Sequence, residues 1–423
     1  MNIHENIEKM IQLLENGDMD KAKDLFLKIK NSNNDEEKYL IAEELLQLGF
    51  LNEAKELYEL LLVSYPNEGE LKVSLAEILI EMDKESDAIS YLDSIQEDDP
   101  DYPRALLILA DLYQMQGLVE VSENKLRQAK QLLPDESIID FALGELYASE
   151  GKNNEAIKFY EELLNRGKTL IAGVDINGRL AEVLSSAGKF EEALPFFERA
   201  VEENNEINTL FGYALTAYQA GFFKKAIELF IQLREMDPEY HSLYLYLGKC
   251  YESEEDLENA MQAVKSGIAV DEFNKELYQF GGKLALKLGD ESLAEEYFRQ
   301  ALVLDSGYID AALTLNKLLL HQQRYEDVLE ITLQMEKEGD IDPQLHWDAA
   351  ISFQALEQYQ DALKHYQQAY NDLKNHSEFL AEYGYFLMEE GKRSEAIEIF
   401  QTLLHDDPLN EEWISLLERL EDH

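Results

Sequence analysis

Few side chains in this chain have a type and spacing that could support catalysis, and the nearest match is a short phosphate-binding pattern. Gly167-Lys168-Thr169 has the residue types that end a nucleotide-binding loop, where the lysine and the hydroxyl residue contact phosphates and Mg²⁺. That loop also requires a glycine five positions before its last glycine, and this chain has Glu162 there, within a sequence that favours a helix rather than a strand. The pattern therefore does not indicate nucleotide binding.

The other reactive residue types do not form a recognisable site either. The chain has neither a Gly-x-Ser-x-Gly turn nor a His-Glu-x-x-His pair, and its eight histidines are scattered. The single cysteine, Cys250, can form no intrachain disulfide and is predicted to pack as a small apolar residue. A calcium loop would need alternating oxygen ligands and a turning glycine, which the acidic run lacks: Glu252, Glu254, Glu255, Asp256 and Glu258. We predict no catalytic, cofactor-binding or metal-binding residues, and no enzyme activity.

Charge excludes further classes of partner. The chain has 37 Lys and Arg residues against 87 Asp and Glu residues, a formal net charge of −50, which would repel nucleic acid and anionic membranes. Because 45% of the residues are hydrophobic, we interpret the acidic excess as the solvated surface of a folded protein. The first residues do not have the pattern of a secretory signal, and no apolar run approaches the roughly 20 residues of a membrane span. We expect a cytoplasmic protein without membrane insertion.

The elements that must position any functional side chain are predicted from an internal repeat. A small residue recurs mostly at steps of 34 residues, beginning at Ala22 and ending at Ala396. The members of this column are Ala22, Ala54, Ala88, Ser122, Ala156, Ala193, Ala226, Ala260, Ala294, Val328, Ala362 and Ala396. Each step has the length of one helical hairpin, so the column predicts a linear array in which each unit packs on its neighbours.

Three further columns keep the same register. Another small residue precedes most markers by twelve positions, a large apolar residue such as Tyr160 or Phe298 follows by four, and proline often follows by twelve. Glycine often precedes the marker by five positions, where one helix must stop and the next begin. Paired small columns allow two helices to approach closely, and the large residue one turn later fills the enclosed space.

This arrangement closely resembles the tetratricopeptide repeat (TPR) family, whose motif has small residues at positions eight and twenty, an aromatic at twenty-four and proline at thirty-two. The resemblance covers roughly residues 3 to 408. It implies an all-α fold, a right-handed α-solenoid superhelix of about twelve helical hairpins. The family's tryptophan at position four is absent, and units ten and eleven diverge most, with Gln323, Val328 and Thr332 at motif positions.

The spacing also predicts the organisation of the chain. Residues 1–166 should form units one to five, and residues 178–408 units six to twelve. The longer connection between them, 167–177, is the expected place for a bend or domain boundary. Residues 409–423 should form a C-terminal capping helix, begun by Asn410 and with its apolar stripe made by Trp413, Leu416, Leu417 and Leu420.

The resemblance also implies where a partner binds. In TPR proteins the first helix of each hairpin lines a concave groove, and the ninth residue of the repeat points into it. Here this position, the ninth-position column, carries five consecutive acids and later three consecutive lysines: Glu43, Glu77, Asp111, Glu145 and Glu182, then Lys249, Lys283 and Lys317. Four positions earlier, one helical turn away, apolar residues are expected to form the floor, among them Tyr39, Leu107, Phe141, Phe211 and Trp347.

We therefore predict a scaffold or adaptor that holds a segment of another protein in this groove, a basic segment at units two to six and an acidic one at units eight to ten. Chance could also produce such charge columns, and the lysines could instead pair with neighbouring acids. The family's clamp for a C-terminal carboxylate uses Asn or Arg where this chain has Tyr246, Phe280 and Thr314. The alternative functions are a self-associating structural protein, such as a homodimer, and a non-catalytic regulatory subunit of an enzyme.

Overall fold

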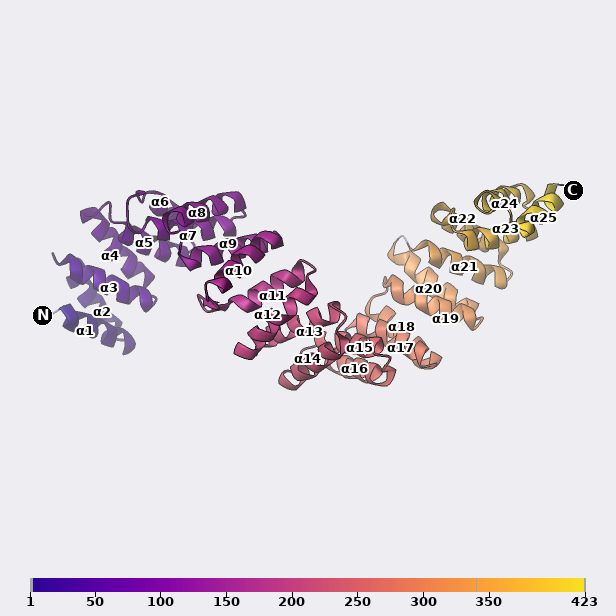
Figure 1. Ribbon diagram of the computed structural model, residues 1–423, viewed down its shortest axis with the longest axis horizontal. Coiled ribbons are helices and arrows are strands. Elements are labelled where there is room, and N and C mark those ends of the chain that lie inside the picture. Colours follow the sequence, from indigo (N-terminus) through magenta and orange to yellow (C-terminus); the bar gives the residue numbers. More distant parts are fainter. Residues whose placement is uncertain (1–2, 340, 422–423) are drawn as a thin grey trace. The chain divides into compact units, whose positions relative to one another are not determined.

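The computed structural model describes residues 3–339 and 341–421, which form twenty-five α-helices and one short β-hairpin (Figure 1). The predicted first and last segments also include residues 1–2 and 422–423, which lie outside the described residues. The chain divides into two compact units, Met1–Asn205 and Glu206–His423.

The first unit contains twelve of the described helices and the hairpin β1–β2. Their bounds are α1 Ile3–Glu15, α2 Met19–Lys30, α3 Asp35–Gln47, α4 Leu51–Ser64, α5 Gly69–Glu81, α6 Glu85–Asp93, α7 Tyr102–Met115, α8 Val119–Leu132, α9 Ser137–Ser149, α10 Asn153–Asn165, β1 Leu170–Ile171, β2 Val174–Asp175, α11 Ile176–Ser186 and α12 Phe190–Glu203.

The second unit contains the other thirteen described helices. Their bounds are α13 Ile207–Gln219, α14 Phe223–Met236, α15 Ser242–Ser253, α16 Leu257–Val270, α17 Lys275–Lys287, α18 Glu291–Leu304, α19 Ile309–His321, α20 Tyr325–Glu338, α21 Pro343–Ala355, α22 Tyr359–Leu373, α23 Ser377–Glu389, α24 Arg393–Asp406 and α25 Glu411–Glu421.

Helices α1 to α24 pair in chain order into twelve hairpins, each of which packs chiefly on its neighbours in the chain. The small columns allow the predicted close approach within a hairpin. A Cβ added at Gly144 would lie 2.8 Å from the Tyr160 ring, and one at Gly282 would lie 2.5 Å from the Phe298 ring. Each aromatic follows its glycine by sixteen residues (160 − 144 and 298 − 282), so the packing repeats with the register of the sequence.

The turn between the two helices of a hairpin requires a left-handed backbone. Gly117 and Gly289, five residues before their markers, have φ of 73° and 77°. The equivalent residues of units without this glycine adopt the same conformation at a steric cost, since L-residues with a side chain disfavour it. These are Asp83, Glu255, Gln323 and Glu357, with φ between 57° and 61°.

The buried side chains of these hairpins include Asp140 and Cys250. Asp140 on α9 is fully buried, and its carboxylate pairs with Lys130 of α8, at 2.6 Å, and with Arg166, just after α10. Asp140 therefore links α9 to α8 and to the end of α10. Cys250 on α15 is a free, fully buried thiol, as predicted, and burial raises its pKa to about 12.

The longer connection, 167–177, contains the β-hairpin, in which Leu170 pairs with Asp175 and Ile171 with Val174. Asp175 then begins α11, because its carboxylate accepts hydrogen bonds from the backbone amides of Asn177 and Gly178. The two compact units divide between Asn205 and Glu206, after α12. A bend at 167–177 stays a prediction.

The C-terminal helix α25 caps the last hairpin. Asn410 accepts hydrogen bonds from the backbone amides of Glu412 and Trp413 at the start of the helix. Leu416 and Leu417 are buried, and the Trp413 ring stacks on Phe400 of α24 with centroids 5.6 Å apart. The predicted fold class, an all-α array of TPR hairpins with a capping helix, is confirmed.

Candidate protein-binding surface

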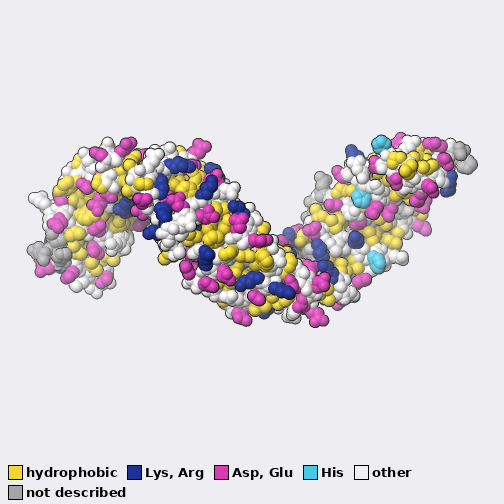
Figure 2. All heavy atoms as spheres, viewed as in Figure 1, with side chains coloured by type: hydrophobic (Ala, Val, Ile, Leu, Met, Phe, Trp, Pro, Cys, Tyr) yellow, Lys and Arg dark blue, Asp and Glu magenta, His cyan; other side chains and the backbone are white. Residues whose placement is uncertain are grey.

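The ninth-position column lies on the first helices of the hairpins, as predicted, and all of its charged members reach solvent. The acids lie on α3, α5, α7, α9 and α11, and the lysines on α15, α17 and α19. Asp111, Glu182, Lys283 and Lys317 are exposed, whereas Glu43, Glu77, Glu145 and Lys249 are half-buried. Figure 2 shows acidic side chains over the visible face of the molecule, with fewer lysines and arginines among them.

The apolar row one turn earlier is only partly accessible. Tyr39, Leu107, Phe141 and Phe211 are half-buried, so part of each side chain is available for contact. Trp347 is only 8% exposed and donates its indole N–H to Glu382 Oε2 at 2.7 Å. Of the predicted floor residues, Trp347 therefore belongs chiefly to the core of its hairpin.

Arginines that sequence reasoning missed neutralise part of the acidic column. Arg104 at the start of α7 pairs with Glu77, 2.6 Å apart. Arg179 of α11 forms a two-pronged pair with Glu145, at 2.8 Å and 2.7 Å, and also contacts Glu182. Bidentate arginine–carboxylate pairs are among the stronger charged contacts in proteins. Three of the five predicted acids therefore already have a cationic partner within the chain.

Tyrosine hydroxyls occupy further acceptor positions in the first unit. Tyr160 donates to Glu145 at 2.6 Å. The Tyr39 hydroxyl lies 3.0 Å from Glu43 and 2.9 Å from Glu70, and burial with these carboxylates raises its pKa far above the ordinary value. Within the described residues only Asp111, of the five acids, has neither a cation nor a hydrogen-bond partner on its side chain.

The lysines of the ninth-position column in the second unit, unlike most of the acids, have no ion-pair partner among the described residues. Within the described residues, Lys249, Lys283 and Lys317 have no carboxylate at ion-pair distance, although the two other lysines of α17 do. Lys275 pairs with Asp305 and Lys287 with Glu252. Lys249 instead lies over the Tyr246 ring, 5.4 Å from its centroid. These three ammonium groups are therefore available to an external carboxylate.

The same column continues into an apolar depression. Ile351 on α21 and Tyr385 on α23 follow Lys317 at the ninth position, and both line a cavity of 350 Å³. The other lining residues are Gln354, Ala355, Tyr366 and Glu382. In the second unit the predicted surface thus combines unpaired lysines with an apolar pocket.

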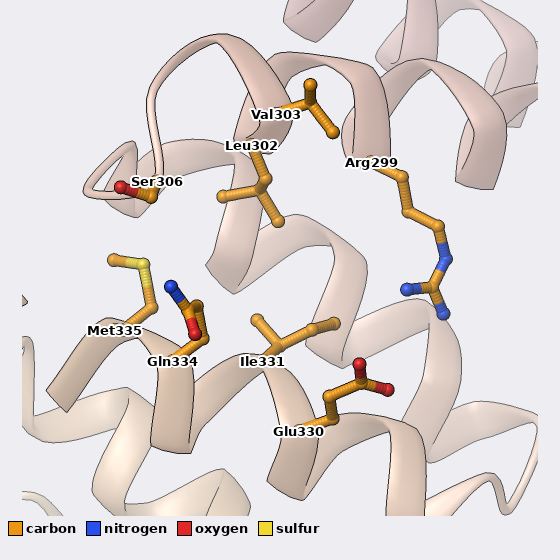
Figure 3. A pocket seen from close by; sticks show the side chains of 8 residues that line it. All are labelled: Arg299, Leu302, Val303, Ser306, Glu330, Ile331, Gln334 and Met335. Atoms are coloured by element: carbon orange, nitrogen blue, oxygen red, sulfur yellow. The ribbon is translucent and has the colours of Figure 1, made fainter. Parts of the chain in front are cut away.

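A second depression of the same volume, 350 Å³, lies on second helices, outside the predicted column. Figure 3 shows Leu302 and Val303 of α18 beside Ile331 and Met335 of α20, with Arg299 at one side. Its position and apolar lining were not predicted.

No helix among the described residues is both long and apolar enough to cross a membrane. Comparison with protein families finds TPR models over much of the chain. A model of YpiA-like tetratricopeptide repeats matches residues 114–168, and a model of YpiA-like C-terminal tetratricopeptide repeats matches 343–410. General tetratricopeptide repeat models match residues 45–112, 178–208, 213–272 and 276–308.

Two curated proteins show the range of similarity. The TPR repeat-containing protein YpiA of Bacillus subtilis (strain 168) is 41% identical over 416 residues, 98% of each chain. The Protein CTR9 homolog of Arabidopsis thaliana is 24% identical over 304 residues, 67% of this chain and 28% of that protein.

Solved structures with related repeats are more distant. YrrB, described as a TPR protein with an unusual peptide-binding site, is 18% identical, with a TM-score of 0.38, over 44% of this chain and 97% of its own. A tetratricopeptide repeat protein from Parabacteroides merdae is 17% identical, with a TM-score of 0.42, over 60% of this chain and 99% of its own. The full-length similarity to YpiA shows that this chain belongs to the YpiA-like family of tetratricopeptide repeat proteins, a repeat class typical of protein-interaction scaffolds.

Proposed function

We propose that this protein is a non-catalytic scaffold that holds an extended, acidic segment of another protein along the first helices of its second unit. The observation that supports this proposal is the set of unpaired lysines at equivalent positions of consecutive hairpins: Lys249, Lys283 and Lys317. Unpaired lysines occur elsewhere in this chain, so the proposal is supported by the repetition of these three at one position of three consecutive hairpins.

The three lysines lie on adjoining helices. Lys287 of α17 pairs with Glu252 of α15 at 2.6 Å, and the Gln279 amide of α17 donates to the Asp310 carbonyl of α19 at 3.1 Å. One extended ligand could therefore contact all three ammonium groups in turn. The pocket at Ile351 and Tyr385 would accept an apolar side chain beyond the acidic part of the segment.

The acidic column supports a basic partner less well. Arg104 and Arg179 already neutralise Glu77, Glu145 and Glu182, so a basic segment would have to displace them. Asp111 and Glu43 are the predicted acids without a cationic partner among the described residues. A basic segment at the first unit would therefore find fewer unpaired charges than an acidic segment finds at the second unit.

The test uses the full chain and a defined probe, a fluorescein-labelled peptide of alternating Glu and Leu residues. The binding variant is Lys249→Glu/Lys283→Glu/Lys317→Glu. The control variant, Lys158→Glu/Lys168→Glu/Lys265→Glu, changes the net charge equally at exposed lysines outside the column. Binding is measured by fluorescence anisotropy in about 0.15 M salt. At this ionic strength the Debye length is about 8 Å, so the negative charge of the rest of the chain is largely screened.

We expect the peptide to bind the wild type and the control variant equally. If each lysine contributes about 0.5–1 kcal/mol, the binding variant should bind roughly 10- to 150-fold more weakly. Equal affinity of the two variants would exclude the lysine column as the binding site. A Lys-Leu peptide of the same length tests the basic alternative.

Self-association is the competing function, and it predicts a different result. Light scattering of the wild type at low and at physiological salt measures its mass in solution. A monomer under both conditions excludes the homodimer, whereas a dimer that the lysine substitutions disrupt would place a second copy of the chain on this surface.

A further inference from the structure

Three side chains that can bind metals converge where α20, α21 and α22 meet. They are Glu336 of α20, His346 of α21 and His365 of α22, consecutive helices in Figure 1. The two histidine Nδ1 atoms are 3.3 Å apart, and Glu336 Oε1 lies 3.6 Å from His346 Nδ1 and 3.9 Å from His365 Nδ1. We propose that this triad binds a transition-metal ion, with Zn²⁺ as the best-fitting metal.

The dimensions of the triad suit an ion between the three atoms. A triangle with sides of 3.3, 3.6 and 3.9 Å has a point about 2.1 Å from each corner, close to zinc–nitrogen and zinc–oxygen bond lengths. A tetrahedral ion, lifted slightly out of this plane, would need the ligands to move inward by only a few tenths of an ångström. Two imidazoles and one carboxylate are also a ligand set typical of zinc with an open fourth position.

The contacts of Glu336 are better explained by metal binding than by hydrogen bonding to the two histidines. Its carboxylate oxygen is too far from either imidazole nitrogen for a normal hydrogen bond, and its side chain forms no other hydrogen bond within the described residues. Without a metal, one imidazole can donate to the other, but the carboxylate faces both rings without a donor at bonding distance. An ion between the three would satisfy all three acceptors.

Packing holds the His365 ring in place. His365 is 2% exposed, and its ring lies 5.1 Å from the Phe353 ring between centroids. Burial lowers the pKa of both histidines, which favours the neutral imidazoles that bind metals. The position of the His365 ring is therefore set by packing before any ion binds.

An open polar depression gives access to the triad. Its volume is 670 Å³, and Glu336 and His346 line it together with Lys364, Gln368 and Asp372. Gln368, one helical turn after His365, has a buried Oε1 with no hydrogen-bond partner in the described residues. This unsatisfied acceptor could receive a hydrogen bond from a water on the fourth coordination position.

The ion would have a structural role in the array. Glu336 belongs to the tenth hairpin, whereas His346 and His365 belong to the eleventh, so the ion would link two units. These units diverge most from the repeat motif, with Thr332 and Gln323 at motif positions. An ion at the junction between them would therefore add a link between two hairpins whose sequences depart from the motif.

The test uses the full chain after treatment with a chelator, and Zn²⁺ itself as the probe in calorimetric titrations. The ligand variants are Glu336→Gln and His346→Gln, both at half-buried positions. The controls are Glu326→Gln, an exposed acid on the same helix α20, and His321→Gln, an exposed histidine on α19. The controls report Zn²⁺ that binds loosely to the many surface acids.

We expect one tight Zn²⁺ per chain in the wild type and in both controls, and at least tenfold weaker binding in each ligand variant. Zn²⁺ should also raise the melting temperature of the wild type but not of the ligand variants, and bound Co²⁺ should show the visible absorption of a four-coordinate ion. Binding that is equal in ligand and control variants, or absent from the wild type, would overturn the proposal.

Discussion

Substituting Gly282 by alanine should loosen the ninth hairpin, although alanine is the better helix former. The new Cβ would lie 2.5–2.8 Å from three ring atoms of Phe298, which is fully buried and cannot turn away. Overpacking of a core costs about 1–3 kcal/mol, and the gain in helix propensity returns about 0.8–1 kcal/mol. We therefore expect a net loss of about 1 kcal/mol, and at most about 2 kcal/mol.

Hydrogen exchange by mass spectrometry on the full chain measures this loss locally. The opening free energy of α17 and α18 should fall while that of distant hairpins stays unchanged, because each hairpin packs on its neighbours. In a Phe298→Leu background the same Gly282→Ala change should become neutral or stabilising, a coupling of at least about 1 kcal/mol.

The equivalent position of the seventh hairpin is a matched control, since Ala214 is buried there sixteen residues before Phe230 (230 − 214). Ala214→Gly should destabilise its hairpin by about 1 kcal/mol, because this site already accommodates a methyl group. If Gly282→Ala instead stabilised the ninth hairpin by the full propensity gain, close approach to Phe298 would not explain the glycine.

Three shorter predictions concern other features of the fold. Asp140→Asn should lower stability by about 3 kcal/mol, since Lys130 and Arg166 lose their buried partner, and faster exchange across α8–α10 would show it. Gln323→Gly should increase the free energy of unfolding by about 1 kcal/mol, because φ there is 58° and glycine adopts this conformation without strain. The urea midpoint should therefore rise, and a lower midpoint would show that Gln323 is not strained. Cys250, with its pKa raised to about 12, stays a thiol at pH 8, so iodoacetamide should modify it only after unfolding, as mass spectrometry can check.

The sequence predicted the fold well because the packing is periodic. Gly144 and Tyr160 recur at the same spacing as Gly282 and Phe298, so the contact that each pair makes could be inferred from the columns alone. The left-handed turns were predictable where glycine marks them. The left-handed conformation of Glu255 was not predictable, because the neighbouring helices impose it and glutamate itself disfavours a positive φ.

The charged surface was only partly predictable, because single columns do not show contacts between columns. Arg179 lies 34 residues after Glu145 (179 − 145) and on the next first helix, and a comparison of acids with bases one repeat later would have revealed it. Among the residues that the structure describes, Lys283 and Lys317 have no carboxylate partner of this kind.

The histidine pair could not have been found in this way. His346 and His365 are nineteen residues apart (365 − 346), on the two helices of one hairpin, and no repeated spacing connects them. Their approach depends on the pairing of α21 with α22, and Glu336 is brought to them by the packing of α20 on α21.

Packing between chain neighbours has a mechanical consequence. Among the described residues, the main contacts join helices that are close in chain order, so if the two ends are pulled apart a terminal hairpin can detach by losing the contacts to its neighbour. The protein should therefore lengthen in small increments at modest force, each hairpin of the 34-residue repeat releasing about 11 nm of chain. An optical trap would record this extension as a series of small steps. A metal ion bound between α20 and α22 would make one of these steps require more force.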